Sequence, residues 1–324
     1  MVRMNAKDLR IVFMGTPEFA VPSLRALVAA GYNVVGVVTT PDKPAGRGQQ
    51  LRESDVKIAA KELNLPILQP EKLRDEAFVE AMRALQPDLG IVIAFRMLPE
   101  VIWAMPRLGT FNLHASLLPE YRGAAPINWA IINGERETGV TTFLLNHEID
   151  KGAIIGQLRE PIADDDTIGT LYDRLMHKGV GLVLETVDKL AAGEISPIEQ
   201  QHIDESTLKP APKIFKEDCL IDWSKPGVEI VNFVRGLSPY PAAWSRLYRQ
   251  GQEVGSAKLF RVAFHAGVHG EPCGTIRTDY RTLLEVACAD GWIAIEELQL
   301  AGKRRMATRD LLLGLRDIDT CQFQ

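Results

Sequence analysis

Short apolar runs alternate with amphipathic segments along the first two-thirds of the chain. Apolar runs of this length are typical of strands buried on both faces, whereas apolar spacings of three and four residues indicate helices. We expect strands at 9–15, 32–40, 87–95, 108–116 and 139–150, and helices at 22–31, 54–65, 76–85 and 167–193. Ser54 is the expected N-cap of the second helix, and Gly31 the expected end of the first. This alternation predicts an α/β domain with a Rossmann-like, mostly parallel sheet.

The pattern changes after Gly193. Residues 195–215 are polar and show no hydrophobic period, so we expect a linker there. Helical spacing returns at 227–237, and short β-like runs follow at 242–251, 256–266, 272–279 and 282–300. Asp290-Gly291 predicts a hairpin within the last run. Short strands in such succession predict a C-terminal OB-like β-barrel, so the expected domains are 1–194 and 216–324.

Composition and charge restrict the class of protein. Of the 324 residues, 46% are hydrophobic and 24% are charged, and no apolar run is long enough to span a membrane. Residues 1–10 lack the apolar core of a signal peptide, and the four cysteines form no CxxC motif, so we expect reduced thiols and a cytoplasmic location. The net charge is −5, and residues 216–324 hold 14 basic and 14 acidic side chains. A polyanionic partner would therefore have to bind at a local cluster of basic side chains, because neither part of the chain has a net positive charge.

The most informative segment is 109–135, with the sequence GTFNLHASLLPEYRGAAPINWAIINGE. Asn112 and His114 lie two residues apart in an apolar run, so on a strand their side chains point to the same face. A turn rich in Pro, Arg and Gly follows, as at the strand ends that carry active sites in open α/β sheets. An amide and an imidazole there can stabilise an oxyanion, and the imidazole can transfer a proton. The alternative is a polar pair satisfied by backbone groups.

Asp150 is the expected third member of this group, because a carboxylate beside His114 would orient the imidazole ring. An aspartate before a turn is also common as a cap. His147 and Glu148 could compete for its role, and His114, His147 and Asp150 could together bind a metal, although their spacing is not that of a metal motif. Ser116 is a weaker candidate, as a hydrolase nucleophile, since it lacks the G-x-S-x-G turn.

Two cationic segments are candidates for phosphate contacts. Residues 39–51 follow a strand and combine prolines and glycines with Lys43 and Arg47, which indicates a solvated loop or a mobile arm that grips phosphates. The glycines of this loop do not form a dinucleotide-binding fingerprint. Near the C-terminus, Lys303 and Arg304 belong to a basic run that forms either a solvated face or a nucleic-acid contact beside the barrel.

Five segments together resemble the methionyl-tRNA formyltransferase family, in order and over nearly the whole chain. They are IVFMGTPEFA, PDKPAGRGQQL, NLHASLLPEYRGAAPI, APKIFKEDCLIDWS and LQLAGKRRMATRDLL. The Asn-x-His and SLLP motifs with a later Asp are shared with glycinamide ribonucleotide and sugar-nucleotide formyltransferases. The PAGRG loop, the junction at 211–224 and the AGKRRM ending narrow the resemblance to the enzymes that act on tRNA.

The resemblance implies that a formyl group passes from 10-formyltetrahydrofolate to the amine of methionyl-initiator tRNA, for translation initiation and without a metal. It implies catalytic roles for Asn112, His114 and Asp150. The implied binding residues are Ser116, Leu117, Leu118 and Pro119 for folate, and Lys43, Arg47, Lys303 and Arg304 for tRNA. No membrane or DNA partner is expected, and the chain is expected to be a monomer.

Two other functions stay open. A formyltransferase acting on an amino-sugar nucleotide would share the three catalytic residues but would not need the cationic PAGRG loop. A noncatalytic tRNA-binding protein would not need the intact Asn112, His114 and Asp150 set. One departure from the resemblance lies at 94–99, where AFRMLP is one residue shorter than the family's AYGxxLP segment and carries Arg96 in the glycine region. We therefore expect the wall of the folate pocket to differ there.

Overall fold

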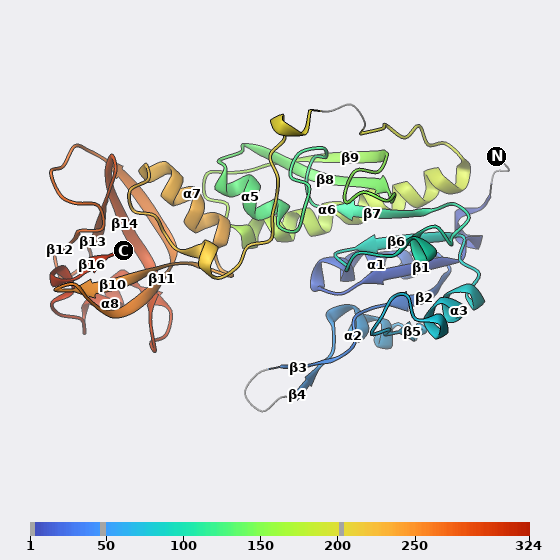
Figure 1. The fold of residues 1–324 in the computed structure, drawn as a ribbon, viewed down its shortest axis with the longest axis horizontal. Coiled ribbons are helices and arrows are strands. Elements are labelled where there is room, and N and C mark those ends of the chain that lie inside the picture. Colours follow the sequence, from blue (N-terminus) through green and yellow to red (C-terminus); the bar gives the residue numbers. More distant parts are fainter. Residues whose placement is uncertain (1–3, 46–49, 201–203) are drawn as a thin grey trace. The chain divides into compact units, whose positions relative to one another are not determined.

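The computed structural model describes residues 4–45, 50–200 and 204–324, which form two compact units (Figure 1). The first unit contains the chain up to Gly123, together with Gly139–Glu160 and Tyr172–Pro210. The second contains Ala124–Thr138, Pro161–Leu171 and Ala211–Gln324. The domain limits expected from the sequence, 1–194 and 216–324 with a linker at 195–215, stay predictions.

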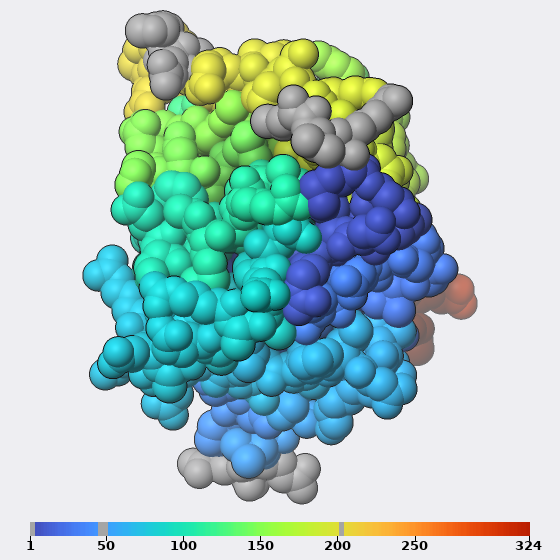
Figure 2. All heavy atoms as spheres, turned by 90° about the vertical axis from the view of Figure 1, so that its right-hand side faces the viewer, coloured from blue at the N-terminus to red at the C-terminus, as the bar shows by residue number. Residues whose placement is uncertain are grey.

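A seven-stranded sheet forms the centre of the first unit, with the strand order β5-β2-β1-β6-β7-β8-β9. The strands are β1 (Ile11–Gly15), β2 (Val34–Val38), β5 (Ile67–Leu68), β6 (Leu89–Ile93), β7 (Thr110–His114), β8 (Glu137–Leu144) and β9 (Ile154–Pro161). All pairings from β5 to β7 are parallel, and β8 runs antiparallel to β7. Figure 2 shows one face of the molecule, on which atoms from the N-terminal part of the chain (blue) adjoin atoms from segments farther along the first unit (teal). The predicted Rossmann-like, mostly parallel sheet is confirmed.

Helices cover the sheet, and two of their ends are those expected from the sequence. They are α1 (Val21–Ala29), α2 (Asp55–Glu62), α3 (Glu76–Ala84), α4 (Glu100–Trp103) and α6 (Ile168–Ala192). The Ser54 hydroxyl accepts a hydrogen bond from the Lys57 amide at 3.1 Å, which confirms the predicted N-cap of α2. Gly31 follows α1 at a φ of +78°, a left-handed conformation in which glycine ends a helix without strain.

Opposite faces of the sheet pack against different helices. Apolar side chains of β1, β2 and β6, such as Val12 and Val92, pack with α3 and α4. On β7, Leu113 contacts α6 so closely that a Cβ on Gly179 would lie 2.6 Å from a Leu113 methyl carbon. Because side chains alternate along a strand, Asn112 points away from α6. Asn112 and His114 therefore lie on the face of β7 opposite to the one that Leu113 packs against α6.

Two segments of the first unit differ from the sequence-based expectation. The strand expected over 139–150 ends at Leu144, so Asp150 does not lie on a strand. The Asn146 side chain accepts a hydrogen bond from the Glu148 amide at 2.9 Å, a local turn that competes with an extended chain. Within the loop expected at 39–51, β3 (Lys43–Ala45) and β4 (Gln50–Arg52) pair as an antiparallel hairpin.

A β-barrel forms most of the second unit, with the strand order β12-β13-β14-β11-β10-β16 and β15 paired to β14. The strands are β10 (Ala243–Arg249), β11 (Gln252–Ala266), β12 (Ile276–Thr278), β13 (Leu284–Cys288), β14 (Gly291–Leu300), β15 (Met306–Ala307) and β16 (Gln322–Phe323). An isolated bridge between Thr275 and Gln322 joins the two ends of this order, so the barrel is nearly closed. The unit also contains α5 (Pro126–Ile132), α7 (Gly227–Leu237) and α8 (Thr308–Leu312). The predicted OB-like barrel is confirmed.

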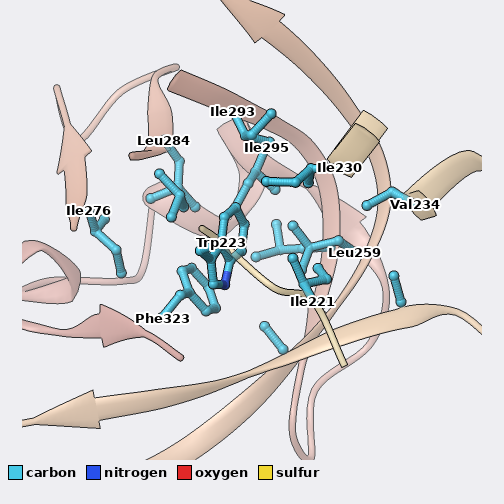
Figure 3. Close-up of a cluster of buried hydrophobic side chains, with 14 of the residues drawn as sticks. Ile221, Trp223, Ile230, Val234, Leu259, Ile276, Leu284, Ile293, Ile295 and Phe323 are labelled. Carbon is cyan, nitrogen blue, oxygen red and sulfur yellow. The ribbon is translucent and has the colours of Figure 1, made fainter. Parts of the chain in front are cut away.

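The core of the barrel centres on two aromatic rings. Trp223 and Phe323 lie with ring centroids 5.5 Å apart, and Ile230 of α7 packs into the same cluster (Figure 3). The predicted hairpin at Asp290-Gly291 is confirmed between β13 and β14. Gly291 opens β14 at a point where a Cβ would lie 2.2 Å from the His265 carbonyl oxygen, so only glycine fits there.

No helix in the described part of the chain combines the length and apolar character that a membrane span requires.

Candidate active site

Strand β7 ends with the polar pair that the sequence singles out. Its parallel partner β6 lies in register, with Val92 opposite Asn112, and its antiparallel partner β8 places Thr141 opposite His114. The pair therefore stands at the carboxyl end of β7, where the parallel part of the sheet meets its antiparallel edge. Ligands of open α/β sheets bind at carboxyl ends of strands, so the position fits an active site.

His114 is held by a backbone carbonyl group. Its Nε2 lies 2.9 Å from the Tyr121 carbonyl oxygen, and the side chain is almost completely buried. A carbonyl oxygen can only accept, so Nε2 must carry a proton. In the neutral ring Nδ1 then has a free lone pair, and it can donate only when the ring is charged. The Tyr121 contact thus makes Nδ1 the chemically active nitrogen.

Asp150 faces that nitrogen. Its Oδ2 lies 3.9 Å from His114 Nδ1, and its side chain is 13% exposed. The same oxygen accepts a hydrogen bond of 3.0 Å from the Gly123 amide. A separation of 3.9 Å exceeds a hydrogen bond and leaves space for a proton-bearing group that could contact both residues. The structure therefore brings together the histidine and aspartate that the sequence pairs, although Asp150 sits in a loop.

Asn112 completes the group at the end of β7. Its Oδ1 is buried, and among the residues that the structure describes none donates a hydrogen bond to it. A buried amide oxygen without a donor is unfavourable in the isolated protein. Such an arrangement is expected where a substrate supplies the missing partner.

The alternative candidates have other partners. The Ser116 hydroxyl is fully buried and donates to the Glu120 carbonyl oxygen at 2.6 Å, so it stabilises the following turn and is not free to attack a substrate. His147 is 71% exposed, lies 3.5 Å from Glu100 and packs edge-on against Trp103. Glu148 pairs with Lys151 at 3.0 Å. These contacts favour Asp150 as the carboxylate that faces His114.

Two residues that sequence reasoning missed hold the SLLP turn. The buried Thr141 hydroxyl donates to the Ser116 carbonyl oxygen at 2.6 Å and accepts from the Leu118 amide at 3.2 Å. Gln157 donates to the Leu118 carbonyl oxygen at 2.8 Å. Leu118 precedes a cis peptide bond to Pro119, and its side chain packs with Phe143. Strands β8 and β9 thereby fix the backbone of this turn, whose Leu117 side chain is half-buried.

The predicted cationic arm carries an exposed lysine. Lys43 opens the β3–β4 hairpin, and Arg47 lies outside the described residues. Beside the hairpin, Asp42 accepts hydrogen bonds from Lys57 and from Gln69. The hydrogen bond from Lys57 is the main reason that the pKa of Asp42 lies below its usual value. This ion pair joins the start of the hairpin to α2.

The second cationic candidate lies on the barrel, in the turn after β14. Lys303 and Arg304 are exposed, and within the described part of the chain neither side chain forms an ion pair. Their neighbour Arg305 differs, because it makes a bidentate contact with Glu297 at 2.6 and 2.8 Å. That hydrogen bond lowers the pKa of Glu297. Lys303 and Arg304, unlike Arg305, are therefore available to a partner.

Arg96, where the chain departs from the resemblance at 94–99, forms hydrogen bonds with a neighbouring segment of the first unit. The Arg96 guanidinium donates to the backbone carbonyl groups of Pro70 and Glu71, so it joins the end of β6 to the segment before α3. A half-buried arginine used in this way fixes a loop, and replacing it would leave two carbonyl groups without these donors.

Comparison with known proteins is consistent with this arrangement. Residues 9–187 match the Formyl transferase family, and residues 213–316 match the Formyl transferase C-terminal domain. A solved structure of WlaRD, a sugar 3N-formyl transferase in the presence of dTDP and 5-N-formyl-THF, superposes with a TM-score of 0.62 at 20% identity. It covers 91% of this chain and 99% of that one, and at this identity it supports the fold alone.

Two curated relatives are far more similar. Methionyl-tRNA formyltransferase of Parabacteroides distasonis is 58% identical, and that of Bacteroides thetaiotaomicron is 57% identical. Each match covers 97% of this chain and 98% of the relative. Identity at this level over both chains shows that this protein is an enzyme of the methionyl-tRNA formyltransferase family.

Proposed function

We propose that this protein transfers the formyl group of 10-formyltetrahydrofolate to the free amino group of methionyl-initiator tRNA, as a cytoplasmic monomer acting before translation begins. The observation that carries the proposal is the match to methionyl-tRNA formyltransferases along nearly the entire chain. The geometry at the end of β7 supports it, because Asn112, His114 and Asp150 supply the groups that acyl transfer to an amine requires.

Attack by the amine creates negative charge on the formyl oxygen. The nitrogen lone pair forms a bond to the formyl carbon, and the carbonyl electron pair moves to the oxygen. The carboxamide of Asn112 would donate a hydrogen bond to that oxyanion, and its buried Oδ1 would accept from the amine. A prearranged donor in a water-poor site stabilises such charge strongly, because it needs no reorientation during the reaction.

The attacking nitrogen must also lose a proton. His114 Nδ1 carries a lone pair in the neutral ring, so it can take that proton, and the resulting imidazolium faces Asp150 Oδ2. The charged ring can next donate from Nδ1, and the tetrahydrofolate nitrogen gains a proton as its bond to the formyl carbon breaks. Asp150 would stabilise the transient positive charge and keep the ring in place.

Binding of the two substrates is assigned to separate elements. The turn formed by Ser116, Leu117, Leu118 and Pro119 would hold the folate, with its backbone fixed by Thr141 and Gln157. The loop that carries Lys43 and Arg47 would insert into the acceptor end of the tRNA. Lys303 and Arg304 on the barrel would contact the phosphates of the tRNA.

The test of substrate class is a formyl-transfer assay with 10-formyltetrahydrofolate and two acceptors. We expect turnover with charged initiator tRNA and at least about a hundredfold lower kcat/KM with an amino-sugar nucleotide, which lacks the tRNA backbone that the cations recognise. Preference for the amino-sugar nucleotide would support the rival enzyme, and binding of tRNA without transfer to either acceptor would support a noncatalytic protein.

The barrel contacts predict a specific change in salt dependence. Replacing Lys303 and Arg304 together by glutamine should weaken tRNA binding and reduce the slope of log Kd against log salt by about 2, because each lost phosphate contact removes about one. Binding titrations at several salt concentrations measure this slope. Arg305→Gln is the matched control, since Arg305 already pairs with Glu297. Equal slopes for the double variant and the wild type would contradict the contact.

A further inference from the structure

The side chain of Gln200 joins two loops of the candidate active site. Its Nε2 donates to the carbonyl oxygens of Asp150, at 3.1 Å, and Gly152, at 2.7 Å. Its Oε1 accepts from Arg122 Nη2 at 2.8 Å, and the residue is only 6% exposed. Both amide protons and the amide oxygen are thus used inside the protein. A buried amide with every group paired fixes its partners in place.

These contacts form a closed circuit with the catalytic carboxylate. Arg122 directly precedes Gly123, whose amide donates to Asp150 Oδ2 at 3.0 Å. The circuit therefore runs from Gln200 to the Asp150 backbone, from the Asp150 side chain to Gly123, and from Arg122 back to Gln200. Oδ2 is also the oxygen that faces His114 Nδ1. Gln200 thus acts on the position of the atom that the proposed proton transfer uses.

Asp150 needs such support because of its backbone conformation. Its φ is +55°, in the left-handed region that residues with a Cβ seldom occupy. It also lies beyond the end of β8, so no strand pairing holds it. A strained residue keeps its conformation only when its surroundings determine it from several sides. The Gln200 amide provides two of the hydrogen bonds that do so.

The chain around Gln200 holds the same two loops. Ile198 forms a backbone bridge with Ile154, just after the Asp150 loop. Glu205 pairs with Lys151 in that loop and lies 3.6 Å from Arg122. Farther on, the Lys209 carbonyl oxygen accepts from the Tyr121 amide at 2.8 Å, and Tyr121 holds His114.

We propose that Gln200 is a positioning residue, which fixes Asp150 Oδ2 relative to His114 and thereby raises kcat. The proposal rests on the proposed function, and it adds a residue from outside the Formyl transferase match at 9–187. The signal in the sequence is weak, because a glutamine in a polar, Pro-containing stretch has no periodicity to mark it as buried.

The first test uses two substitutions. Gln200→Met keeps the length of the side chain and removes the amide, whereas Gln200→Glu keeps the Arg122 contact and places an oxygen against two carbonyl groups. We expect both to lower kcat by between about tenfold and a hundredfold, because small displacements of a catalytic group have effects of this size. KM for 10-formyltetrahydrofolate and for tRNA should change less than about twofold, since Gln200 is buried and its amide is paired inside the protein.

A double-mutant cycle separates positioning from general stability. In the Asp150→Ala background, Gln200→Met should lower kcat no further, because the group it positions is absent. A structural role would lower kcat by the same factor in both backgrounds. Gln322→Met is the matched control, since the Gln322 amide donates to the Cys273 carbonyl oxygen in the barrel at 3.1 Å. We expect its kcat to equal that of the wild type.

An independent readout needs no activity. Hydrogen exchange at the Gly123 amide should become faster in Gln200→Met, because Asp150 Oδ2 would no longer be held against it. If the wild type forms formyl-methionyl-tRNA but Gln200→Met keeps kcat within twofold, the positioning role is wrong and the proposed function stands. If neither variant folds, Gln200 is a structural residue and the inference also fails. Absence of transfer by the wild type would overturn the proposed function instead.

Discussion

Replacing His114 by alanine is expected to lower kcat by about a hundredfold or more, with KM for both substrates nearly unchanged. Proton transfer by a positioned side chain contributes about a hundredfold to ten-thousandfold in other enzymes, and His114 would take the proton from the attacking amine. Because Nε2 donates to the Tyr121 carbonyl group, Nδ1 is the ring nitrogen that can take the proton, and the alanine variant lacks it. Single-turnover assays with saturating folate and charged tRNA measure the chemical step directly.

His147→Ala is the matched control for this experiment. His147 is close to Asp150 in the sequence, but it is 71% exposed and pairs with Glu100. Its removal should leave kcat within about twofold of the wild type, as is usual for surface substitutions. If His147→Ala lost as much activity as His114→Ala, the assignment of the proton acceptor would be wrong. A near-normal kcat for His114→Ala would also contradict that assignment.

Asn112→Ala should behave like His114→Ala in kcat but differ in stability. The buried Oδ1 has no donor among the described residues, so alanine at this position removes an unfavourable polar group from the folded protein. A functional residue that is unfavourable for folding is common where a site is built for a ligand. The two residues of β7 would then share a role in catalysis, whereas of their two side chains His114 has a hydrogen-bond partner among the described residues and the Asn112 Oδ1 has none.

The sequence predicts most of the fold because local patterns specify its elements. Buried parallel strands require continuous apolar runs, and the cap of α2 needs only Ser54 and the amide of Lys57, three residues away. The end of β8 was not predicted, because residues 145–150 contain enough apolar side chains to continue a strand. What stops the strand is a turn formed by Asn146, and its effect depends on partners that periodicity does not report.

In the candidate site, too, some features follow from local sequence patterns and others depend on contacts made only in the folded chain. Asn112 and His114 could be paired from the sequence because strand geometry places residues i and i+2 on one face. The contacts of His114 with the Tyr121 carbonyl group and of Asp150 with the Gly123 amide involve backbone atoms, which every residue carries, so no side-chain motif marks them. Thr141 and Gln157 were missed for another reason. They lie on separate strands and meet the SLLP turn only after the sheet has formed.

The loop that carries Asp150 is also constrained by a glycine, and its replacement should have a large effect. A Cβ added to Gly152 would lie 1.6 Å from the Leu144 carbonyl oxygen, which belongs to the last residue of β8. A backbone atom cannot rotate away as a side chain can, so in Gly152→Ala the loop itself must shift. We expect a loss of about 1–3 kcal/mol in the free energy of unfolding, which denaturant titration measures.

The same shift should reach the chemistry, because Gly152 is two residues from Asp150 and its carbonyl oxygen accepts from Gln200. A displacement of about 1 Å in a catalytic group can reduce the rate a hundredfold, so kcat for Gly152→Ala should fall by about that factor even when the protein is fully folded. Gly181→Ala is the control, since a Cβ there meets nothing within 4 Å on α6. It should raise stability by about 0.5–1 kcal/mol without changing kcat. A normal kcat in folded Gly152→Ala would show that the position of Asp150 does not limit the reaction.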